Sequence, residues 1–400
     1  MPDPGDSNRG LTMRLGRIVI AGAGLAGLRA AEALRAAGYT AALDIVGAER
    51  HLPYTRPPLS KSFLAAGGAR VDYAFPGALS LDASWHLGSY ATRLDLNARA
   101  LELDNGKRLP FDGLVLATGS RARDWLAEPP PNGVLTLRTI DDAQVLRAAV
   151  RGHRRRILIV GAGFIGGEVA AQAALLGHRV TVVEIEDQPL VRLLGVDVGK
   201  LLADSHRGHG VDLRLGTAVE RFAADGAALR GAWLSDGTYV AADLCVLALG
   251  AEPSTSWLSD SGIQVNGGVV CTADLRVCDV ADVVAAGDVA RWPHPMFGGE
   301  SVNIGHWTNA AEQGAHAART LLASAGDSEP FTDIPTFWSE LHDLKLRSVG
   351  LPGLATEIRM LEGDLAESKG VVGYFRSGQL VGVLGINCAV RQYRDLVGAR

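Results

Sequence analysis

Short apolar runs alternate with glycine-rich turns and alanine-rich stretches along most of the chain. Two of these runs, residues 18–21 and 157–160, are each followed by a turn of the form Gly-x-Gly-x-x-Gly. Each turn opens an alanine-rich stretch that closes at a glycine, Gly38 or Gly177. A short apolar run predicts a buried strand, and an alanine-rich stretch predicts a helix. The pattern therefore predicts two strand–turn–helix units whose turns begin 139 positions apart.

The segments that follow the two units also repeat. A hairpin signal at residues 104–107 precedes an apolar run that ends in a small-residue turn, and Asp236-Gly237 precedes a similar run at 244–250. Asn-Gly and Asp-Gly pairs favour tight hairpin turns. The repeated order indicates an internal duplication of a βαβ unit, a hairpin and a small-residue turn.

Beyond the duplication the pattern predicts a strand at 283–286, a helix from about Thr308 to Ala323, a hairpin around 376–379 and a helical tail from Ala389. We therefore expect an α/β protein with two Rossmann-like dinucleotide-binding domains and a C-terminal α+β domain. The predicted boundaries are a disordered leader at 1–14, the first dinucleotide-binding domain at 15–120 and 253–328, the second at 121–252, and the C-terminal domain at 329–400.

Composition and charge exclude several classes of function. The net charge of −5 and the pI of about 6.1 do not indicate the excess of positive charge that is typical of a nucleic-acid-binding protein. No run of about eighteen apolar residues predicts a membrane span, and the polar first 14 residues lack the apolar core of a signal peptide, so we expect a cytoplasmic protein. None of the four cysteines lies in a C-x-x-C pair or in metal-ligand spacing, so we predict buried, reduced thiols and no metal site.

The glycine turns carry the first candidate chemistry. The first glycine makes the tight bend, the second lets the backbone approach a pyrophosphate, and the third lets the helix pack on the strand. The phosphates then meet free N–H groups at the helix N-terminus. One such turn is compatible with simple packing, but two predict two bound dinucleotides and electron transfer between them. The predicted binding residues are Gly22, Gly24, Ala26 and Gly27 in the first turn, and Gly161, Gly163, Phe164, Ile165 and Gly166 in the second.

An acidic residue at the end of the next strand normally binds the adenosine ribose. Glu184 lies 18 positions after Gly166 and is followed by Ile185-Glu186-Asp187 with no neighbouring arginine. A 2′-phosphate would meet several carboxylates there, so we predict NADH rather than NADPH. In the first unit, Glu49 is the predicted ribose ligand.

Several further motifs identify a family. They are Pro53-Tyr54-Thr55-Arg56-Pro57-Pro58-Leu59-Ser60-Lys61, Ala117-Thr118-Gly119, Ala285-Ala286-Gly287-Asp288-Val289-Ala290, His306-Trp307-Thr308-Asn309-Ala310 with Gln313, and Phe337-Trp338-Ser339-Glu340. With them the chain resembles the glutathione-reductase-like flavoproteins. Among these it resembles the NADH-dependent ferredoxin reductases of the putidaredoxin reductase type, which serve bacterial oxygenases and cytochromes P450. The resemblance covers nearly everything from Arg17 onward.

The resemblance implies that the first turn holds FAD and the second holds NADH. Arg56 and Arg121 would contact FAD from two sides, and Asp288 would accept a hydrogen bond from a ribityl hydroxyl. The helix beginning near Trp307 and Thr308 would point its N-terminus at the flavin ring, where a positive dipole end favours the anionic reduced flavin. The remaining implied cofactor-binding positions are Ala117, Thr118, Gly119, Gly250 and Gly287.

The resemblance also implies catalytic roles for Lys61, Glu168 and Trp307. Lys61 would lie near flavin N5 and pair with Glu168, and Trp307 would stack at the flavin–nicotinamide site. Trp338 would lie near the partner-facing edge. The alternatives are a solvated lysine, an ordinary helix acid, and tryptophans of the core or an interface.

Two positions depart from the family pattern. Ala48 stands where an acid is often found, which moves the ribose role to Glu49. Asn303-Ile304-Gly305 replaces an Arg-x-Glu segment, which removes two charges and bears on partner recognition or nicotinamide affinity. Arg291 and Arg391 are candidate contacts for an acidic ferredoxin.

The implied function is NADH:ferredoxin oxidoreductase, with an iron–sulfur ferredoxin of the 2Fe-2S type as partner. Residues 51–63 contain no cysteine, which counts against disulfide chemistry beside a flavin. A reductase or oxidase acting directly on a small molecule, and an NADH-sensing flavoprotein similar to apoptosis-inducing factor, remain alternatives. The sequence leaves open whether the chain is a monomer or a homodimer.

Overall fold

The computed structural model describes residues 15–65, 73–125, 129–324 and 326–398, so the predicted leader at 1–14 lies outside the described residues. The chain forms two compact units. Unit 1 comprises the described residues of Met1–Thr55, Val71–Arg121 and Glu252–Pro335, and unit 2 comprises those of Arg56–Arg70, Ala122–Ala251 and Thr336–Arg400. Each unit is thus assembled from three separate segments. The division into domains made from the sequence stays a prediction.

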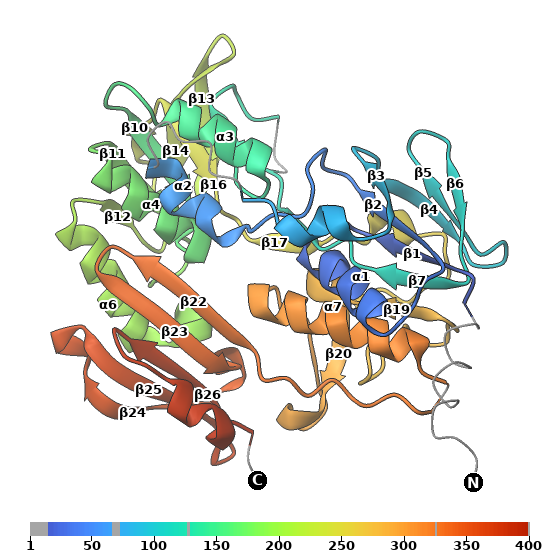
Figure 1. Ribbon diagram of the computed structural model, residues 1–400. Coiled ribbons are helices and arrows are strands. Elements are labelled where there is room, and N and C mark those ends of the chain that lie inside the picture. The colour runs from blue at the N-terminus through green and yellow to red at the C-terminus, as the bar shows by residue number, and fades with distance from the viewer. Residues whose placement is uncertain (1–14, 66–72, 126–128, 325, 399–400) are drawn as a thin grey trace, which may run out of the picture. The chain divides into compact units, whose positions relative to one another are not determined.

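Unit 1 is built on a five-stranded parallel sheet in the order β19-β7-β1-β2-β3. The apolar strand β1 is buried on both faces, as expected for a parallel sheet covered by helices. Helices α1 and α7 pack against each other, and both contact the sheet (Figure 1). The strands are β1 (Arg17–Ala21), β2 (Ala42–Gly47), β3 (Ser84–Leu87), β7 (Gly113–Leu116) and β19 (Val283–Ala285), and the helices are α1 (Leu25–Ala36) and α7 (Trp307–Leu322).

Unit 2 contains a second five-stranded parallel sheet in the order β12-β11-β10-β16-β9. Its strands are β9 (Val134–Thr136), β10 (Arg156–Val160), β11 (Arg179–Val183), β12 (Asp212–Arg214) and β16 (Leu244–Leu247). Its helices are α2 (Ser62–Ala65), α3 (Ile140–Ala149), α4 (Phe164–Leu175), α5 (Val191–Leu194) and α6 (Val196–Gly208).

The two parallel sheets share one topology, which confirms the predicted duplication. In each sheet, four strands follow the same order, and a three-stranded antiparallel sheet is inserted before the fourth of them. These insertions are β4 (Ala91–Asp95), β5 (Ala100–Leu103) and β6 (Arg108–Pro110) in unit 1, and β13 (Val219–Asp225), β14 (Ala228–Leu234) and β15 (Tyr239–Ala241) in unit 2. Only the fifth strand differs, because β19 follows the repeat along the chain whereas β9 precedes it.

The C-terminal region of unit 2 is a five-stranded antiparallel sheet in the order β22-β23-β26-β25-β24. The predicted hairpin is present, with Ser377 and Gly378 at its turn, but the predicted helical tail is wrong. It is the six-residue 3-10 helix η8 (Arg391–Leu396), none of whose residues is buried, so tertiary packing does not stabilise a longer helix there. The strands are β22 (Thr336–Leu341), β23 (Leu344–Gly350), β24 (Glu357–Asp364), β25 (Lys369–Arg376) and β26 (Gln379–Ile386).

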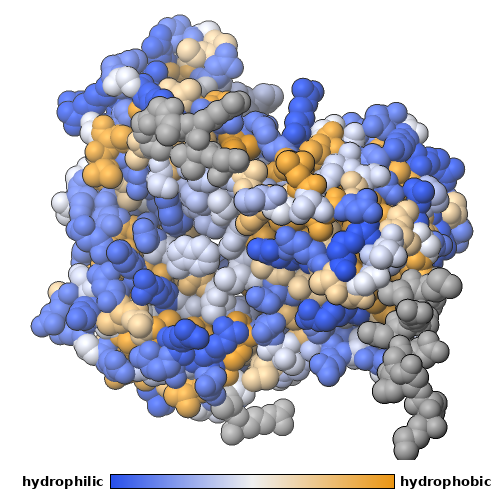
Figure 2. Space-filling model, viewed as in Figure 1, coloured by the Kyte–Doolittle hydropathy of each residue, from blue (hydrophilic) through white to orange (hydrophobic). Residues whose placement is uncertain are grey.

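Five more short strands are present in the described residues. They are β8 (Ser120–Ala122), β17 (Ala251–Pro253), β18 (Val269–Val270) with β20 (Ala290–His294), and β21 (Glu300–Val302) beside β20. No helix in the described part of the chain is long and apolar enough to cross a membrane. Hydrophilic and hydrophobic residues are interspersed over the face seen in Figure 2.

Candidate functional site

The first and third glycines of each turn are required by close backbone contacts. An added Cβ on Gly22 would lie 1.9 Å from the carbonyl oxygen of Ala117, and one on Gly27 would lie 1.9 Å from the Gly22 carbonyl oxygen. In the second turn, a Cβ on Gly161 or Gly166 would lie 2.4 or 2.0 Å from a backbone oxygen. Gly22 and Gly161 also have φ angles of 127° and 104°, which disfavour other residues. These four glycines shape the turns themselves.

The middle glycines have a different environment. An added Cβ on Gly24 or Gly163 would meet no atom within 4 Å. Both are N-cap residues, of α1 and α4, and neither helix has a side-chain cap. By contrast, the N-terminus of α3 is capped by Thr139. Open space beside uncapped N–H groups suits a pyrophosphate, so both turns fit a bound dinucleotide.

The end of β11 carries the predicted ribose ligand. One carboxylate oxygen of Glu184 accepts a hydrogen bond from the Ala162 N–H at 2.7 Å, and the other accepts one from the Glu186 N–H at 3.1 Å. The carboxylate is therefore held against the glycine turn. The expectation that no arginine lies near is wrong, because Arg192 forms an ion pair with Glu186. Sequence inspection missed it because the intervening loop turns back before α5.

In unit 1, the predicted ribose ligand Glu49 is the second residue after β2, whereas Glu184 directly follows β11. The Glu49 carboxylate accepts a hydrogen bond from the Tyr54 hydroxyl at 2.5 Å. Tyr54 belongs to the proline-rich motif, so the strand end and this motif meet within unit 1. Ala48, where the family often has an acid, is exposed.

The small-residue turn at Gly287 and Asp288 is fixed by side chains from other segments of unit 1. The Gly287 N–H donates to Oε1 of Gln313 at 2.8 Å, and Ser120 Oγ donates to Asp288 Oδ2 at 2.7 Å. Asn303 donates to the carbonyl oxygens of Asp288 and Ala290 at 2.8 and 2.7 Å. The departure at residue 303 thus supplies a structural amide that anchors the Asp288 turn.

Trp307 is the first residue of α7 and stacks on Phe75, with ring centroids 6.2 Å apart and planes inclined by 17°. Helix α7 has no side-chain cap, and burial lowers the pKa of its N-cap residue, His306, to about 4. The imidazole at the start of α7 is therefore neutral at pH 7. Thr308 is the second residue of the helix. Ala26 lies in the α1–α7 contact, where a Cβ on Gly314 would come within 2.2 Å of its carbonyl oxygen.

Other predicted FAD contacts are divided between the units. In unit 1, Thr118 donates to the Ser254 carbonyl oxygen at 2.9 Å, and Arg121 forms an ion pair with Glu252. In unit 2, Arg56 donates to the Arg138 carbonyl oxygen at 2.9 Å. The two candidate ferredoxin contacts are divided in the same way, with Arg291 in unit 1 and Arg391 in unit 2.

The predicted Lys61–Glu168 pair is formed within unit 2. Lys61 Nζ lies 2.8 Å from Oε2 of Glu168, and the two side chains are 18% and 3% exposed. Two serines complete the carboxylate environment. Ser60 Oγ donates to Oε2 at 2.5 Å, and Ser339 Oγ donates to Oε1 at 2.5 Å. Neither serine was given a role from the sequence, although Ser60 lies in the motif that ends at Lys61 and Ser339 lies in the Phe337-Trp338-Ser339-Glu340 motif.

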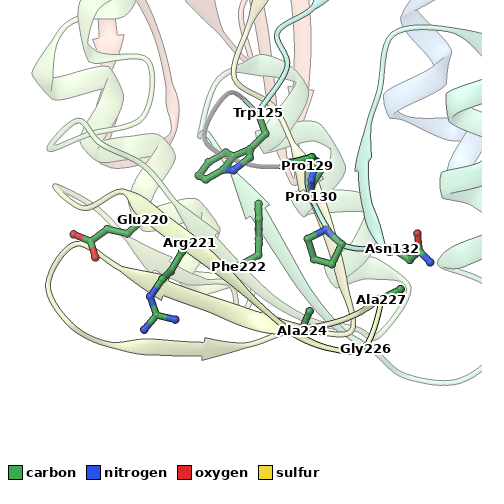
Figure 3. A pocket seen from close by; sticks show the side chains of 11 residues that line it. Trp125, Pro129, Pro130, Asn132, Glu220, Arg221, Phe222, Ala224, Gly226 and Ala227 are labelled. Carbon is green, nitrogen blue, oxygen red and sulfur yellow. The ribbon is translucent and has the colours of Figure 1, made fainter.

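A separate pocket of about 450 Å³ lies in unit 2 between the β13–β14 hairpin and the three prolines at 129–131. Trp125 and Phe222 both line it and pack against each other, with ring centroids 4.9 Å apart (Figure 3). None of the described residues that line this pocket was predicted from the sequence to be a catalytic or cofactor-binding residue.

All four cysteines are unpaired. Cys245 and Cys271 are buried, whereas Cys278 and Cys388 are partly exposed, so the prediction of buried thiols holds for two. Burial raises the pKa of the Cys271 thiol to about 12 and that of Cys245 further. Both thiols are therefore protonated and unreactive at neutral pH.

Within the described residues no group of three metal-ligating side chains could hold a metal ion.

A family model described as pyridine nucleotide-disulphide oxidoreductase matches residues 16–314, which include both glycine turns. The chain belongs to this family of oxidoreductases. Rhodocoxin reductase of Rhodococcus erythropolis is 35% identical over 390 residues, covering 96% of this chain and 88% of the relative. The ferredoxin–NAD(+) reductase component of the anthranilate 1,2-dioxygenase system of Burkholderia cepacia is 36% identical over 397 residues, covering 96% and 92%.

Solved structures show the same relationship. The crystal structure of the covalent putidaredoxin reductase–putidaredoxin complex matches with a TM-score of 0.89 at 29% identity, covering 95% of this chain and 92% of that one. The resemblance and the α/β fold with Rossmann-like domains are therefore confirmed. Despite the family's name, the two buried cysteines of this chain do not suit disulfide exchange.

Proposed function

We propose that the protein is an FAD-dependent NADH:ferredoxin oxidoreductase. The paired glycine turns carry this conclusion, because each combines an uncapped helix N-terminus with open space at its middle glycine. The relatives support the partner, since they are named as reductases of rhodocoxin and of a dioxygenase ferredoxin. Bound FAD supplies the chemistry, which is acceptance of a hydride from NADH and release of electrons singly.

The residues contribute position and electrostatics. In this proposal the turn at Gly24 binds FAD, with Glu49 on its adenosine ribose and Asp288 on its ribityl chain. The turn at Gly163 binds NADH, with Glu184 on the ribose. The cluster of Glu184, Glu186 and Asp187 outweighs the single charge of Arg192, which disfavours a 2′-phosphate.

The Lys61–Glu168 pair serves hydride transfer. A lysine held against a buried carboxylate keeps a fixed position, and a fixed charge acts on a developing charge without reorganisation. Trp338 is 41% exposed, and Arg347 lies opposite it on β23. We propose that this outer surface of β22 and β23 contacts an acidic ferredoxin of the 2Fe-2S type that serves an oxygenase or a cytochrome P450. A cytoplasmic location and a monomeric or homodimeric state remain predictions.

The test is anaerobic reduction of the FAD-loaded protein by NADH, followed by cytochrome c reduction with and without added 2Fe-2S ferredoxins. We expect rapid flavin bleaching with NADH, slow bleaching with NADPH, and cytochrome c reduction that depends on ferredoxin. If no ferredoxin raises the rate, the proposal fails. Direct turnover of a small molecule would then favour the first alternative, and a long-lived charge-transfer complex with NADH would favour a sensing flavoprotein.

A further inference from the structure

Helix α4 packs against β22 through both apolar and polar contacts. Phe164 packs against Phe337, with ring centroids 4.9 Å apart and planes tilted by 56°. Leu341 lies against Gly167, where an added Cβ would come within 2.4 Å of it. Between these apolar contacts Ser339 donates to Glu168. Positions 164, 167 and 168 share one helix face, and positions 337, 339 and 341 share one strand face.

The polar contact is almost completely buried. Glu168 is 2% exposed, Ser339 is 1% exposed and Ser60 is 3% exposed. A buried carboxylate is costly unless its oxygens are hydrogen-bonded. Oε2 has two donors, Ser60 and Lys61, but among the described residues Oε1 has only Ser339. Removal of the Ser339 hydroxyl therefore leaves one carboxylate oxygen without a donor.

The arrangement also constrains the lysine. Lys61 Nζ lies 2.8 Å from Oε2 of Glu168 and donates to the Pro57 carbonyl oxygen at 3.2 Å. If Glu168 lost its donor on Oε1, its carboxylate could rotate to use the remaining donors, and Oε2 would leave its present position. The Lys61 ammonium would then lose its fixed partner.

We propose that Ser339, with Ser60, is a positioning residue that holds the Glu168 carboxylate and thereby fixes the Lys61 ammonium for hydride transfer, an inference that rests on the proposed function. The outward neighbour of Ser339 on the same strand is the exposed Trp338. Adjacent residues of β22 thus face opposite sides of the strand: Ser339 faces the Lys61–Glu168 pair, and Trp338 faces the surface proposed for ferredoxin.

The chain supplies a matched control. Ser348 lies opposite Phe337 on β23, is 2% exposed, and its hydroxyl has no hydrogen-bond partner among the described residues. Ser348→Ala therefore makes the same chemical change on the same sheet, at similar burial, without touching Glu168. Ser339→Thr keeps the hydroxyl and tests whether loss of the donor, rather than altered packing, is responsible for any effect.

The first measurement uses neither NADH nor ferredoxin. The chain has only five lysines, so the acetylation rate of Lys61 by acetic anhydride can be followed by mass spectrometry with the other four as internal references. We expect Ser339→Ala and Ser60→Ala to raise the Lys61 rate about 2- to 10-fold, the range produced by loss of one net hydrogen bond. Ser348→Ala should leave it unchanged, and Ser339→Thr should restore most of the wild-type value.

The second measurement is flavin reduction by saturating NADH in the FAD-loaded full chain. Ser339→Ala should slow this step by about the same 2- to 10-fold while the NADH dissociation constant stays constant. Equal Lys61 labelling and equal rates in Ser339→Ala and Ser348→Ala would overturn the inference. Equal losses in Ser339→Ala and Ser339→Thr would overturn it too, because packing would then explain both. A protein that no ferredoxin oxidises would refute the proposed function but leave the labelling result intact.

Discussion

Replacing Gly163 with alanine separates the folding of the second glycine turn from its binding of a dinucleotide. Gly163 has φ −71° and ψ −173°, which alanine adopts without strain, and an added Cβ meets no atom within 4 Å. We therefore expect Gly163→Ala to change the free energy of unfolding by less than about 1 kcal/mol, with a tendency to stabilise because alanine restricts the unfolded chain.

The same methyl group would occupy the space in which the pyrophosphate approaches the backbone. Forcing an extra methyl group into a close-packed contact costs about 1–3 kcal/mol. That cost corresponds to a rise of about 5- to 150-fold in the dissociation constant for NADH. Flavin reduction measured anaerobically over a range of NADH concentrations gives this constant, and the flavin absorbance of the purified protein checks that FAD binding is unchanged.

Gly166→Ala is the contrasting variant. Its Cβ would lie 2.0 Å from the Gly161 carbonyl oxygen, so the turn itself must deform and the melting temperature should fall. Gly24→Ala repeats the experiment in the first turn and should lower FAD content while sparing the stability of the flavin-free protein. An unchanged NADH dissociation constant in Gly163→Ala, or a loss of stability equal to that of Gly166→Ala, would refute the assignment of this space to a ligand.

Three further predictions follow from other residues. Glu184→Ala should raise the NADH Michaelis constant about 10-fold, because hydrogen bonds to a charged group are lost, and should narrow the NADH/NADPH preference; an unchanged preference contradicts the ribose assignment. Lys61→Ala should slow single-turnover flavin reduction, and an unaltered rate rules out its role in that step. Burial lowers the pKa of His206 to about 4 from 6.5, so its contribution to stability is complete above pH 6.5 and is lost as the pH falls towards 4. The loss is about 2 kcal/mol at pH 5, and His206→Gln should flatten the pH dependence of thermal unfolding between pH 7 and 5, whereas an equally steep profile would contradict this.

Local patterns predicted the two turns and their neighbouring elements because those signals lie within a few residues of each other. Apolar strands, the glycine spacing and an alanine-rich helix are features of one continuous segment. The βαβ units, and the position of Glu184 at a strand end, could therefore be predicted from the sequence. The internal duplication followed from the repeated order of these elements along the chain, whereas the strand order of each sheet was not predicted. The hairpin at Ser377-Gly378 followed from its turn residues.

The contacts that the sequence did not reveal join distant segments. Ser339 reaches Glu168 across 171 positions, and Ser60 reaches it across 108. Ser339 lies in a motif shared with the family, but the motif does not reveal its partner, because that depends on which helix the strand packs against. Arg192 was missed for a related reason: the loop after Asp187 reverses direction, which brings a residue six positions away back to Glu186.

The placement of the fifth sheet strand bears on the order in which the chain acquires its structure during synthesis. In unit 2, β9 precedes its neighbour β16, so all five strands of that sheet lie between Val134 and Leu247. In unit 1, β7 can pair with β19 only after more than 160 further residues have been synthesised. The chain is synthesised from its N-terminus to its C-terminus, and strand pairs that are distant in sequence form slowly. The parallel sheet of unit 2 can therefore be completed while the sheet of unit 1 still has an unpaired edge. A nascent chain ending before Val283 would therefore expose β7 as an unpaired strand edge, the kind of surface that invites aggregation.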